Sequence, residues 1–371
     1  MTLADPAQLR PDPVRQGIST TGIERNWPLN SWWVAAHGSE VGERPILRWI
    51  VELPIALYRT ANGMPAALHN RCPHRWAPLH LGEVNGDNLA CAYHGMQFAP
   101  SGQCVKVPTQ AKTPPAIRVR AFPVAERYGF IWIWTGDVAL ADPDLIPADL
   151  AYLSDPAWHT LWGYKAVNGN FMQVKENVLD LTHFAFLHSK SLGVPGWDRP
   201  PKVEAGETRV TFRQLFEMAP LPAVYAGPAG KPVGKPVTRE SWSTHLTAGS
   251  HHGAVDMHDP EPGLEGLERF SLRVIHLTTP VSISKTHYYW AMARDHGAPF
   301  DVERMRAMND VIFGEDITMI EATQEMGRCA IDHEEAVEFS VTADRAAVEA
   351  RRRVAAAVKA EREGSILAKK A

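Results

Sequence analysis

The sequence predicts an α+β fold with two domains, an all-β domain over residues 28–145 and a second domain over residues 150–365. Residues 28–140 hold short runs of β-branched and aromatic residues between turns, and no long amphipathic helix. The second half holds strand-like runs that are followed by helical stretches, which is typical of an α+β domain. Residues 140–156, rich in Asp, Pro and Ala, predict the linker.

In the first half, turn residues separate the predicted strands. The Asn-Gly pairs at 62–63 and 85–86 are hairpin signals, because Asn and Gly tolerate the positive φ angles of tight turns. Residues 46–59 alternate imperfectly between apolar and polar and contain Pro54. Residues 127–134 (RYGFIWIW) predict a buried strand.

In the second half, the pattern changes from helix to strand and back to helix. A helical stretch is predicted around residues 170–188, and strands dominate from about 208 to 293. Residues 301–328 and 343–363 predict helices. The segment 220–236 holds many Pro and Gly residues and predicts a mobile loop.

The bulk composition excludes several classes of protein. The chain has 371 residues and a formal net charge of −4, which argues against nucleic-acid binding or an anionic membrane surface. No apolar run is long enough for a membrane helix, and the N-terminus does not resemble a signal peptide, so the cytoplasm is the expected location. Four cysteines are too few for a disulfide scaffold and are better explained as ligands or core residues.

Two Cys/His pairs form the first candidate site. Cys72 and His74 are followed, after sixteen intervening residues, by Cys91 and His94. Two thiolates can hold one iron of a [2Fe–2S] cluster and two imidazoles the other. Zinc is the rival metal, but zinc fingers pair like ligands, whereas each turn here carries one Cys and one His. Cys104 lies beyond these turns and is expected in the core.

Residues 72–108 (CPHRWAPLHLGEVNGDNLACAYHGMQFAPSGQCVKVP) resemble the Rieske domain of ring-hydroxylating and demethylating oxygenases. The family's tryptophan after the second His-Gly is Met96 here. The resemblance extends over roughly residues 28–363 and is strongest to the vanillate and dicamba O-demethylase and phthalate dioxygenase branch. It implies a helix-grip catalytic domain, an antiparallel sheet with helices, that carries a mononuclear Fe(II).

The second candidate site lies in residues 176–188 (ENVLDLTHFAFLH). Non-haem oxygenases hold Fe(II) with two histidines and one carboxylate. In a regular α-helix His183 and His188 would lie about 140° apart, so a π-turn or a frayed helix end is needed to bring them together. From the residues alone, Glu315 and Asp316 are equal candidates for the carboxylate, and a buried histidine pair without metal is the alternative.

The resemblance makes this site specific. Residues 177–188 match the family pattern Asn/Glu-x₂-Asp-x₂-His-x₄-His, and residues 314–321 (GEDITMIE) resemble its downstream acidic helix. It implies that His183, His188 and Asp316 hold the iron, whereas Glu315 and Glu321 are expected on a solvated helix face. Asp180 is expected to accept the N–H of a ligand histidine, and in similar enzymes its equivalent bridges to a cluster histidine of a neighbouring subunit, which implies a homotrimer. Asn177 is expected to hydrogen-bond near the iron.

The resemblance also implies the function: a terminal oxygenase that uses O₂ to demethylate or hydroxylate a small aromatic, with or without a carboxylate. The chain contains no G-x-G-x-x-G after a strand, so NADH is expected to be oxidised by a separate reductase, with a ferredoxin as a further candidate carrier. A ring dioxygenase, an electron-transfer Rieske protein without oxygenase activity and a zinc-binding structural protein are the alternatives.

Three histidines are candidate substrate contacts. His276 matches a position where demethylase-like members contact a substrate carboxylate, and His251 and His252 fall on a neighbouring strand. Each of them is equally compatible with an ordinary strand histidine. The Pro- and Gly-rich segment 220–236 is expected to close over the pocket.

Overall fold

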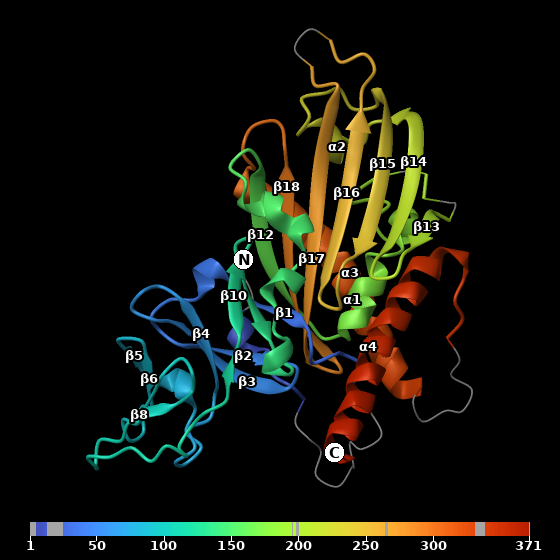
Figure 1. Cartoon of the computed structure of the whole chain (residues 1–371). Helices are drawn as coiled ribbons and strands as arrows, with labels where there is room; N and C mark the ends of the chain where they lie inside the picture. Colours follow the sequence, from blue (N-terminus) through green and yellow to red (C-terminus); the bar gives the residue numbers. More distant parts are fainter. Residues whose placement is uncertain are drawn as a thin grey trace.

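The computed structural model describes residues 5–12, 25–194, 196–197, 200–263, 266–330 and 338–370. The N-terminal half is built from strands, and a long sheet flanked by helices follows (Figure 1). The strands are β1 (Trp32–His37), β2 (Ile46–Ile50), β3 (Leu53–Arg59), β4 (Pro65–His69), β5 (Glu83–Asn85), β6 (Asn88–Ala90), β7 (Gln97–Phe98), β8 (Cys104–Lys106), β9 (Ala121–Phe122), β10 (Val124–Arg127), β11 (Phe130–Trp134), β12 (His159–Val167), β13 (Lys202–Ala205), β14 (Val210–Pro220), β15 (Pro236–His245), β16 (Ser250–His258), β17 (Arg269–Ser282) and β18 (Lys285–Arg294). The helices are α1 (Phe171–Asn177), α2 (Ala223–Ala226), α3 (Val302–Ala330) and α4 (Arg345–Lys370).

The first half contains three small sheets, in the orders β1-β11-β10, β2-β3-β4-β9 and β5-β6-β7-β8. The Asn-Gly pair at 85–86 makes the predicted hairpin, since Asn85 ends β5 and pairs with Asn88 of β6. The predicted strand over residues 127–134 is in fact a tight turn at Tyr128 and Gly129, both with positive φ, followed by β11. The turn reverses the chain so that β10 pairs with β11.

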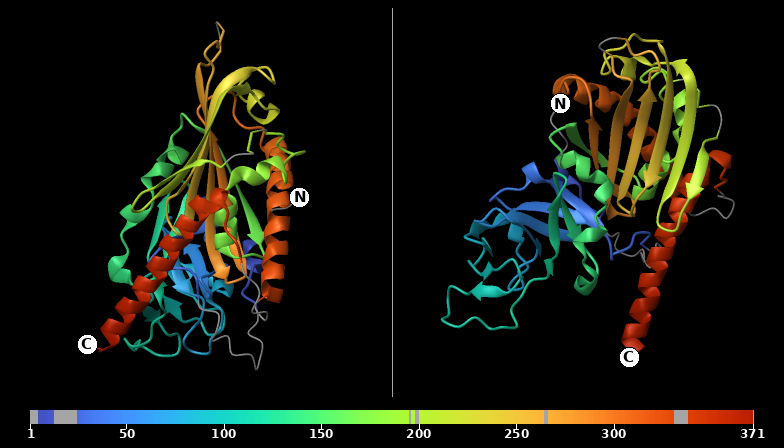
Figure 2. Two further views of the ribbon diagram at one scale, coloured as in Figure 1. Left: turned by 90° about the vertical axis from the view of Figure 1, so that its right-hand side faces the viewer. Right: turned by 45° about the horizontal axis from the view of Figure 1, so that its top comes forward.

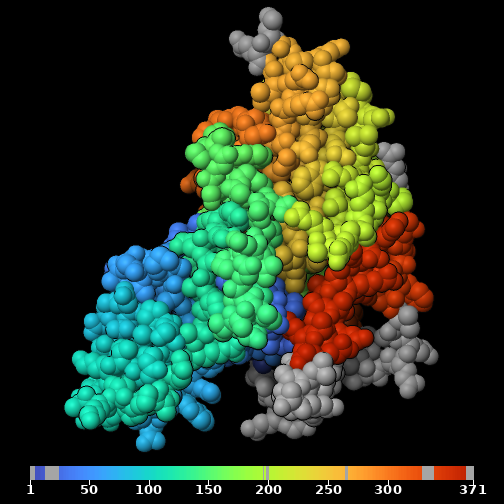
Figure 3. All heavy atoms as spheres, viewed as in Figure 1, coloured from blue at the N-terminus to red at the C-terminus, as the bar shows by residue number. Residues whose placement is uncertain are grey.

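The second half is organised around an antiparallel seven-stranded sheet, in the order β12-β18-β17-β16-β15-β14-β13. Its two faces carry different elements, as the edge-on view shows (Figure 2). One face packs against the β1/β11 region and the 3₁₀ turns of residues 138–154, through a core that includes Trp134, Leu150 and Tyr289. Figure 3 shows this green segment lying over the orange and yellow strands. The other face receives α1 and α3.

The helices differ from the prediction at one functionally important place. The stretch around residues 170–188 is not one helix, because α1 ends at Asn177 and a separate 3₁₀ turn runs from Leu181 to Ala185. Asp180 begins this turn by accepting the backbone N–H of Thr182. The helices predicted at 301–328 and 343–363 are α3 and α4, each with slightly later ends.

The segment 220–236 contains α2 and is anchored to the strands. Lys231 and Lys235 both donate to the Asp259 carboxylate, which is fully buried, at 2.5 Å. The prediction of a mobile loop therefore did not anticipate these ionic contacts. Among the described residues, no helix is long and apolar enough to cross a membrane.

Candidate metal centres and substrate cavity

The two Cys/His loops of the first site have the same backbone design. Cys72 N–H donates to Ala77 and Cys91 N–H donates to Met96, five residues later in each loop. The carbonyls of Cys72 and Cys91 accept from the fourth residue after them, Trp76 and Gly95, and both of these residues have positive φ. Each loop therefore curls back around its own cysteine.

The side chains of these loops separate into a buried and an exposed pair. Cys72 and Cys91 are buried and free of disulfides, and they belong to the core beneath the loops. Burial, with Cys91 as a neighbour, raises the pKa of the Cys72 thiol to about 11. His74 and His94 are exposed, and their ring centroids are 4.5 Å apart. The structure thus brings all four predicted residues to one place, with imidazoles facing solvent and thiols facing the core.

Cys104 and Met96 lie in the same core. Cys104 is 3% exposed, and its Sγ contacts the Lys106 carbonyl at 3.5 Å, so the expectation of a core cysteine is confirmed. Met96 is also buried and lines a hollow beside His74 and His94.

The second site is formed where the 3₁₀ turn meets α3. One donor atom each from His183, His188 and Asp316 lies within 4.8 Å of the others. His188 Nε2 is 3.0 Å and His183 Nε2 3.4 Å from the same oxygen, Asp316 Oδ1. Because α1 ends before Asp180, the two histidines are not constrained to helical spacing, which resolves the conflict that a continuous helix would create.

Hydrogen bonds fix the tautomer of both histidines. His183 Nδ1–H donates to the main-chain carbonyl of Asp180 at 2.6 Å, and His188 Nδ1–H donates to the Glu315 carboxylate at 2.7 Å. Each ring therefore presents the Nε2 lone pair to the site, as metal-bound histidines do. His183 Nε2 is buried without a hydrogen-bond partner. A cation among these three atoms satisfies the orphaned nitrogen and the carboxylate together, so the residues fit a metal.

The electrostatics agree with this fit. Burial opposes ionisation of Asp316, but the imidazoles of His183 and His188 beside it hold the pKa of its carboxyl well below the usual range. Burial lowers the pKa of His188, but Asp316 and Glu315 raise it above its ordinary value overall. The site thus concentrates negative charge around buried imidazoles, which suits a divalent cation.

Two expectations about the surroundings of this site require correction. The Asp180 carboxylate does not bind the His183 ring, because it accepts from the N–H and hydroxyl of Thr182. The ring instead donates to the main-chain carbonyl of Asp180. Glu315 is partly exposed but is not a free surface residue, since its carboxylate accepts from both His188 and the Ser191 hydroxyl. Glu321 accepts from Asn168 and is likewise not free.

Asn177 lies beside the three converging donors without offering an atom to the group. Its Nδ2 donates to Asp316 Oδ1 at 3.1 Å, so it orients the carboxylate from the end of α1. The role of Glu315 as the hydrogen-bond partner of His188 was not predicted, and neither was the part of Ser191. The only signal for Glu315 was its place beside Asp316, and Ser191 gave none.

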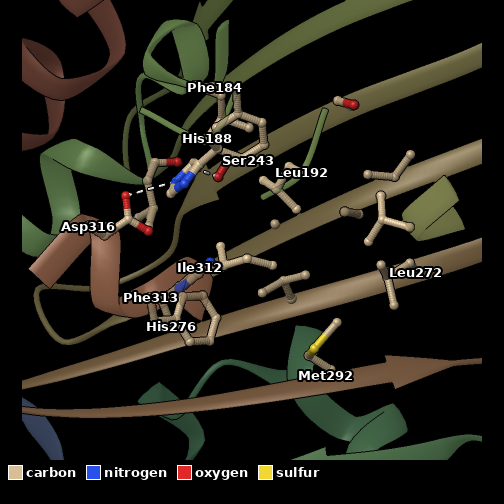
Figure 4. A pocket seen from close by; sticks show the side chains of 18 of the residues that line it. Phe184, His188, Leu192, Ser243, Leu272, His276, Met292, Ile312, Phe313 and Asp316 are labelled. Carbon is tan, nitrogen blue, oxygen red and sulfur yellow. Dashed lines mark hydrogen bonds and ion pairs between the residues drawn. The ribbon is translucent and has the colours of Figure 1, made fainter. Parts of the chain in front are cut away.

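A cavity of about 130 Å³ opens beside the three converging side chains. It is comparable in size to cavities that accept a single benzene ring, of about 150 Å³. Figure 4 shows His188 and Asp316 at one end of it and Leu272 and Met292 at the other. The lining is mainly apolar, with Leu181, Phe184, Leu192, Trp197, Val255, Leu272, Val274, Met292, Ile312 and Phe313 among its residues.

The three candidate substrate histidines occupy different positions. His276 lines the cavity, whereas neither His251 nor His252 does. His252 points to the opposite face of the sheet, where its Nε2 lies 2.9 Å from the Tyr152 hydroxyl. His251 lies on the same face of the sheet as His276, but its Nε2 is hydrogen-bonded to the Ser243 hydroxyl. The expectation of a substrate contact is therefore not supported for His251 and His252.

His276 is neutral in this environment. Burial lowers its pKa to about 3, although the charge of Asp316 acts in the other direction, and the Tyr288 hydroxyl lies 2.6 Å from its Nδ1. It therefore offers a ligand a hydrogen bond and not a positive charge.

Comparison with known proteins decides the family. Residues 31–123 match the Rieske [2Fe-2S] domain, and residues 167–360 match the vanillate O-demethylase oxygenase C-terminal domain. The chain belongs to the Rieske non-haem iron oxygenases. It is thus an oxygenase component with an N-terminal Rieske domain and a C-terminal catalytic domain, and its cofactors are a [2Fe–2S] cluster and a non-haem iron.

Relatives of this oxygenase are similar over most of their length. The vanillate O-demethylase oxygenase subunit of Pseudomonas sp. is 31% identical over 91% of this chain and 97% of its own. The dicamba O-demethylase oxygenase component of Stenotrophomonas maltophilia is 36% identical over 72% and 78%. A crystal structure of dicamba monooxygenase bound to 3,6-dichlorosalicylic acid has a TM-score of 0.79 and 31% identity, covering 90% of this chain and 98% of that one.

Proposed function

We propose that this oxygenase demethylates or hydroxylates a small aromatic at an iron held by His183, His188 and Asp316. The observation that carries the proposal is the convergence of these three donors at the end of an apolar cavity the size of one ring. Iron in such a facial triad supplies the activation of O₂ at positions the protein leaves open. An electron carrier without oxygenase activity has no use for a substrate-sized cavity at that place.

Within this proposal each residue of the chain has a physical task. Asp180 O and Glu315 hold the histidine rings, and Asn177 holds the Asp316 carboxylate. The apolar walls exclude water and position the ring, and His276 contributes a neutral hydrogen bond to the substrate. For a methoxy substrate the balance is one methyl ether, O₂, two electrons and two protons giving a phenol, formaldehyde and water.

The electrons are proposed to enter through a cluster held by Cys72, His74, Cys91 and His94. The exposed imidazoles suit transfer to and from a partner, whereas the buried thiols suit permanent attachment. A separate NADH-oxidising reductase, with or without a ferredoxin, is the proposed donor. We retain 28–145 and 150–365 as the proposed domain limits.

Relatives whose names specify an aromatic substrate support the substrate class. They include the toluene-4-sulfonate monooxygenase system iron-sulfur subunit of Comamonas testosteroni, 33% identical over 80% of this chain and 88% of its own, and the O-demethylases described above.

Metal analysis of the wild type and three variants tests the proposal. The wild type should contain about three irons and two sulfides per chain, counting one [2Fe–2S] cluster and one mononuclear iron. His183→Ala should retain about two irons, two sulfides and the red-brown cluster, yet release no formaldehyde from methoxy-aromatic substrates. Cys91→Ala should lose the cluster, whereas Cys104→Ala should keep it. Full iron content and turnover in His183→Ala would refute the assignment of the triad.

A further inference from the structure

The cavity beside His183, His188 and Asp316, which we call the iron chamber, adjoins two further cavities. A second, narrow cavity of about 20 Å³ shares the walls Val224, Tyr225, Leu272, Met292 and Met308 with the iron chamber. It in turn shares Val224, Pro228, Arg294, Phe300, Met305 and Met308 with a third cavity of about 300 Å³. We call the second cavity the neck and the third cavity the outer chamber, and together with the iron chamber they form one path.

The neck is lined by flexible side chains. Four of the residues that line it are the methionines Met257, Met292, Met305 and Met308, whose unbranched side chains repack more readily than branched ones. A substrate with a narrow chain can therefore pass through the neck while its ring occupies the iron chamber.

Arg294 lines both the neck and the outer chamber. It is 6% exposed, and none of the described residues forms a salt bridge with it. Its Nη2 donates to the Ala298 carbonyl, and its guanidinium lies 4.4 Å from the centre of the Phe300 ring. Its Nε is buried with no hydrogen-bond partner. A buried cation with an unused donor is costly unless something anionic completes it.

The strand register fixes the position of Arg294 relative to the iron chamber. On the cavity face, His276 pairs with Trp290, Val274 with Met292 and Leu272 with Arg294. Arg294 therefore lies two rows of the sheet beyond His276, which is four residues along the strand or about 13 Å. The row between them, Val274 and Met292, is apolar, so an apolar stretch of the path separates Arg294 from His276.

We infer that Arg294 binds the anionic group, carboxylate or sulfonate, of a substrate whose apolar body reaches through the neck to the iron chamber. This inference rests on the proposed function and specifies its substrate class: an elongated aromatic with an anionic end remote from the reacting carbon. Asp301 and Arg304 also line the outer chamber, but both are exposed and carry opposite charges.

Binding of matched acids and amides tests the inference without turnover. Isothermal titration of the anaerobic holoenzyme would compare 6-phenylhexanoate with 6-phenylhexanamide, and phenylacetate with phenylacetamide. The long acid should bind at least about tenfold more tightly than its amide, because a hydrogen-bonded charge contributes more than a neutral bond. The short pair should show no preference, since phenylacetate cannot reach Arg294 from the iron chamber.

Three variants separate the local contact from general charge. Arg294→Gln should reduce the acid preference to about one while the amide affinity stays unchanged, and Arg294→Lys should keep part of the preference. Arg304→Gln removes the same charge from the outer chamber and should keep the preference. The inference is overturned if the wild type does not prefer the long acid, if Arg294→Gln retains the preference, or if Arg304→Gln abolishes it. In each of these cases the iron content and the turnover of neutral methoxy aromatics would be unaffected. The proposed function is therefore tested separately from this inference.

Discussion

The two histidines at the mononuclear site are supported by different kinds of acceptor. His183 donates to a main-chain carbonyl, whereas His188 donates to the carboxylate of Glu315. Because the Nδ1–H of His188 donates to a full negative charge, its Nε2 is the better metal donor of the two histidines. Glu315 is itself held by the Ser191 hydroxyl, so its orientation is fixed before metal arrives.

Replacing Glu315 should therefore weaken the iron site without emptying the cluster. Glu315→Gln removes the charge at nearly constant volume, and iron affinity at the mononuclear site should fall by about 10- to 100-fold. Titration of the apo mononuclear site with Fe(II) under anaerobic conditions measures this directly. Glu321→Gln, on the same helix but bonded to Asn168, is the matched control and should bind iron as the wild type does. Equal affinities in all three proteins would show that Glu315 has no part in metal binding.

Lys175 provides a second test at the residue scale. It is 1% exposed, its Nζ donates to the carbonyls of Thr247 and Ser250, and burial lowers its pKa to about 7. The unfolded chain binds this proton up to a pKa of about 10.4. Between these pKa values the unfolded state therefore holds more protons, and the free energy of unfolding rises with pH.

Lys175→Met removes this titration while keeping an apolar stem of similar length. The wild type should gain stability relative to the variant by up to about 1.4 kcal/mol per pH unit between pH 7 and 10. Urea unfolding at pH 7, 8.5 and 10 gives the difference between the two proteins, which cancels the contribution of other groups. A difference that does not change with pH would mean that Lys175 stays protonated in the folded protein.

Residue type and spacing indicated candidate metal donors, and the family resemblance was needed to choose Asp316 over Glu315, but neither indicated the residues that support these donors. The Cys/His pairs and the two histidines could be found because few other arrangements of these side chains serve a function. The supports depend on contacts over long separations, such as Glu315 to His188, which local patterns do not encode. His252 was misplaced because alternate residues of β16 face opposite sides, and only the register identifies which side holds the cavity.

At the scale of elements, the segment from 220 to 236 is tied down by buried charge. Asp259 is fully buried between Lys231 and Lys235, of which Lys231 is also buried. Residues Val224 and Tyr225, in the same segment, line the cavity. The anchorage of this segment therefore determines how well one wall of the iron chamber is defined.

Breaking that anchorage should loosen the wall. Asp259→Ala leaves Lys231 buried without a counter-charge, which should cost about 3–5 kcal/mol of stability. In this variant, amide hydrogen exchange should become faster than in the wild type, and the increase should be larger in residues 220–236 than in the strands of the sheet. Lys235→Met is the milder comparison, because Lys231 still balances Asp259. If Asp259→Ala has wild-type stability and exchange, the ion pairs do not anchor the segment.

The composition of residues 220–236 predicted a loop but did not indicate its ion pairs with Asp259. Pro and Gly predicted a mobile loop, whereas Lys231 and Lys235 of this segment bind an aspartate more than twenty residues away in sequence. The break between α1 and the following 3₁₀ turn was similarly hidden. Asp180 ends the helical pattern by capping Thr182, a local competition between side chain and backbone that periodicity does not reveal.

At the scale of the whole molecule, the two metal sites are far apart in one chain. The cluster loops lie among β4–β8 at one end of the molecule, and the iron donors lie beside α1 and α3 on the far side of the long sheet (Figure 1). His74 and His94 are exposed, so they are free to face another subunit. From this arrangement and from the family resemblance, we propose that electrons pass between neighbouring subunits of a homotrimer by way of Asp180.

Mixing two inactive variants tests this proposal. Cys91→Ala lacks the cluster but keeps the iron donors, and His183→Ala lacks the mononuclear iron but keeps the cluster. In a ring with transfer between neighbours, a chain with iron is active whenever the adjacent chain supplies a cluster. Random co-assembly at equal amounts should then restore about one quarter of the wild-type turnover per chain, because each condition is met half of the time.

Co-expression is required, so that the subunits assemble together, and mixing the two purified variants provides the control for exchange. Each variant expressed alone should be inactive, and sedimentation should give the mass of three chains for the mixed species. If electrons pass within one chain, every chain lacks either the cluster or the iron, and the co-expressed protein stays inactive. A trimer without restored turnover would therefore separate assembly from electron transfer and reject the relay through Asp180 between subunits.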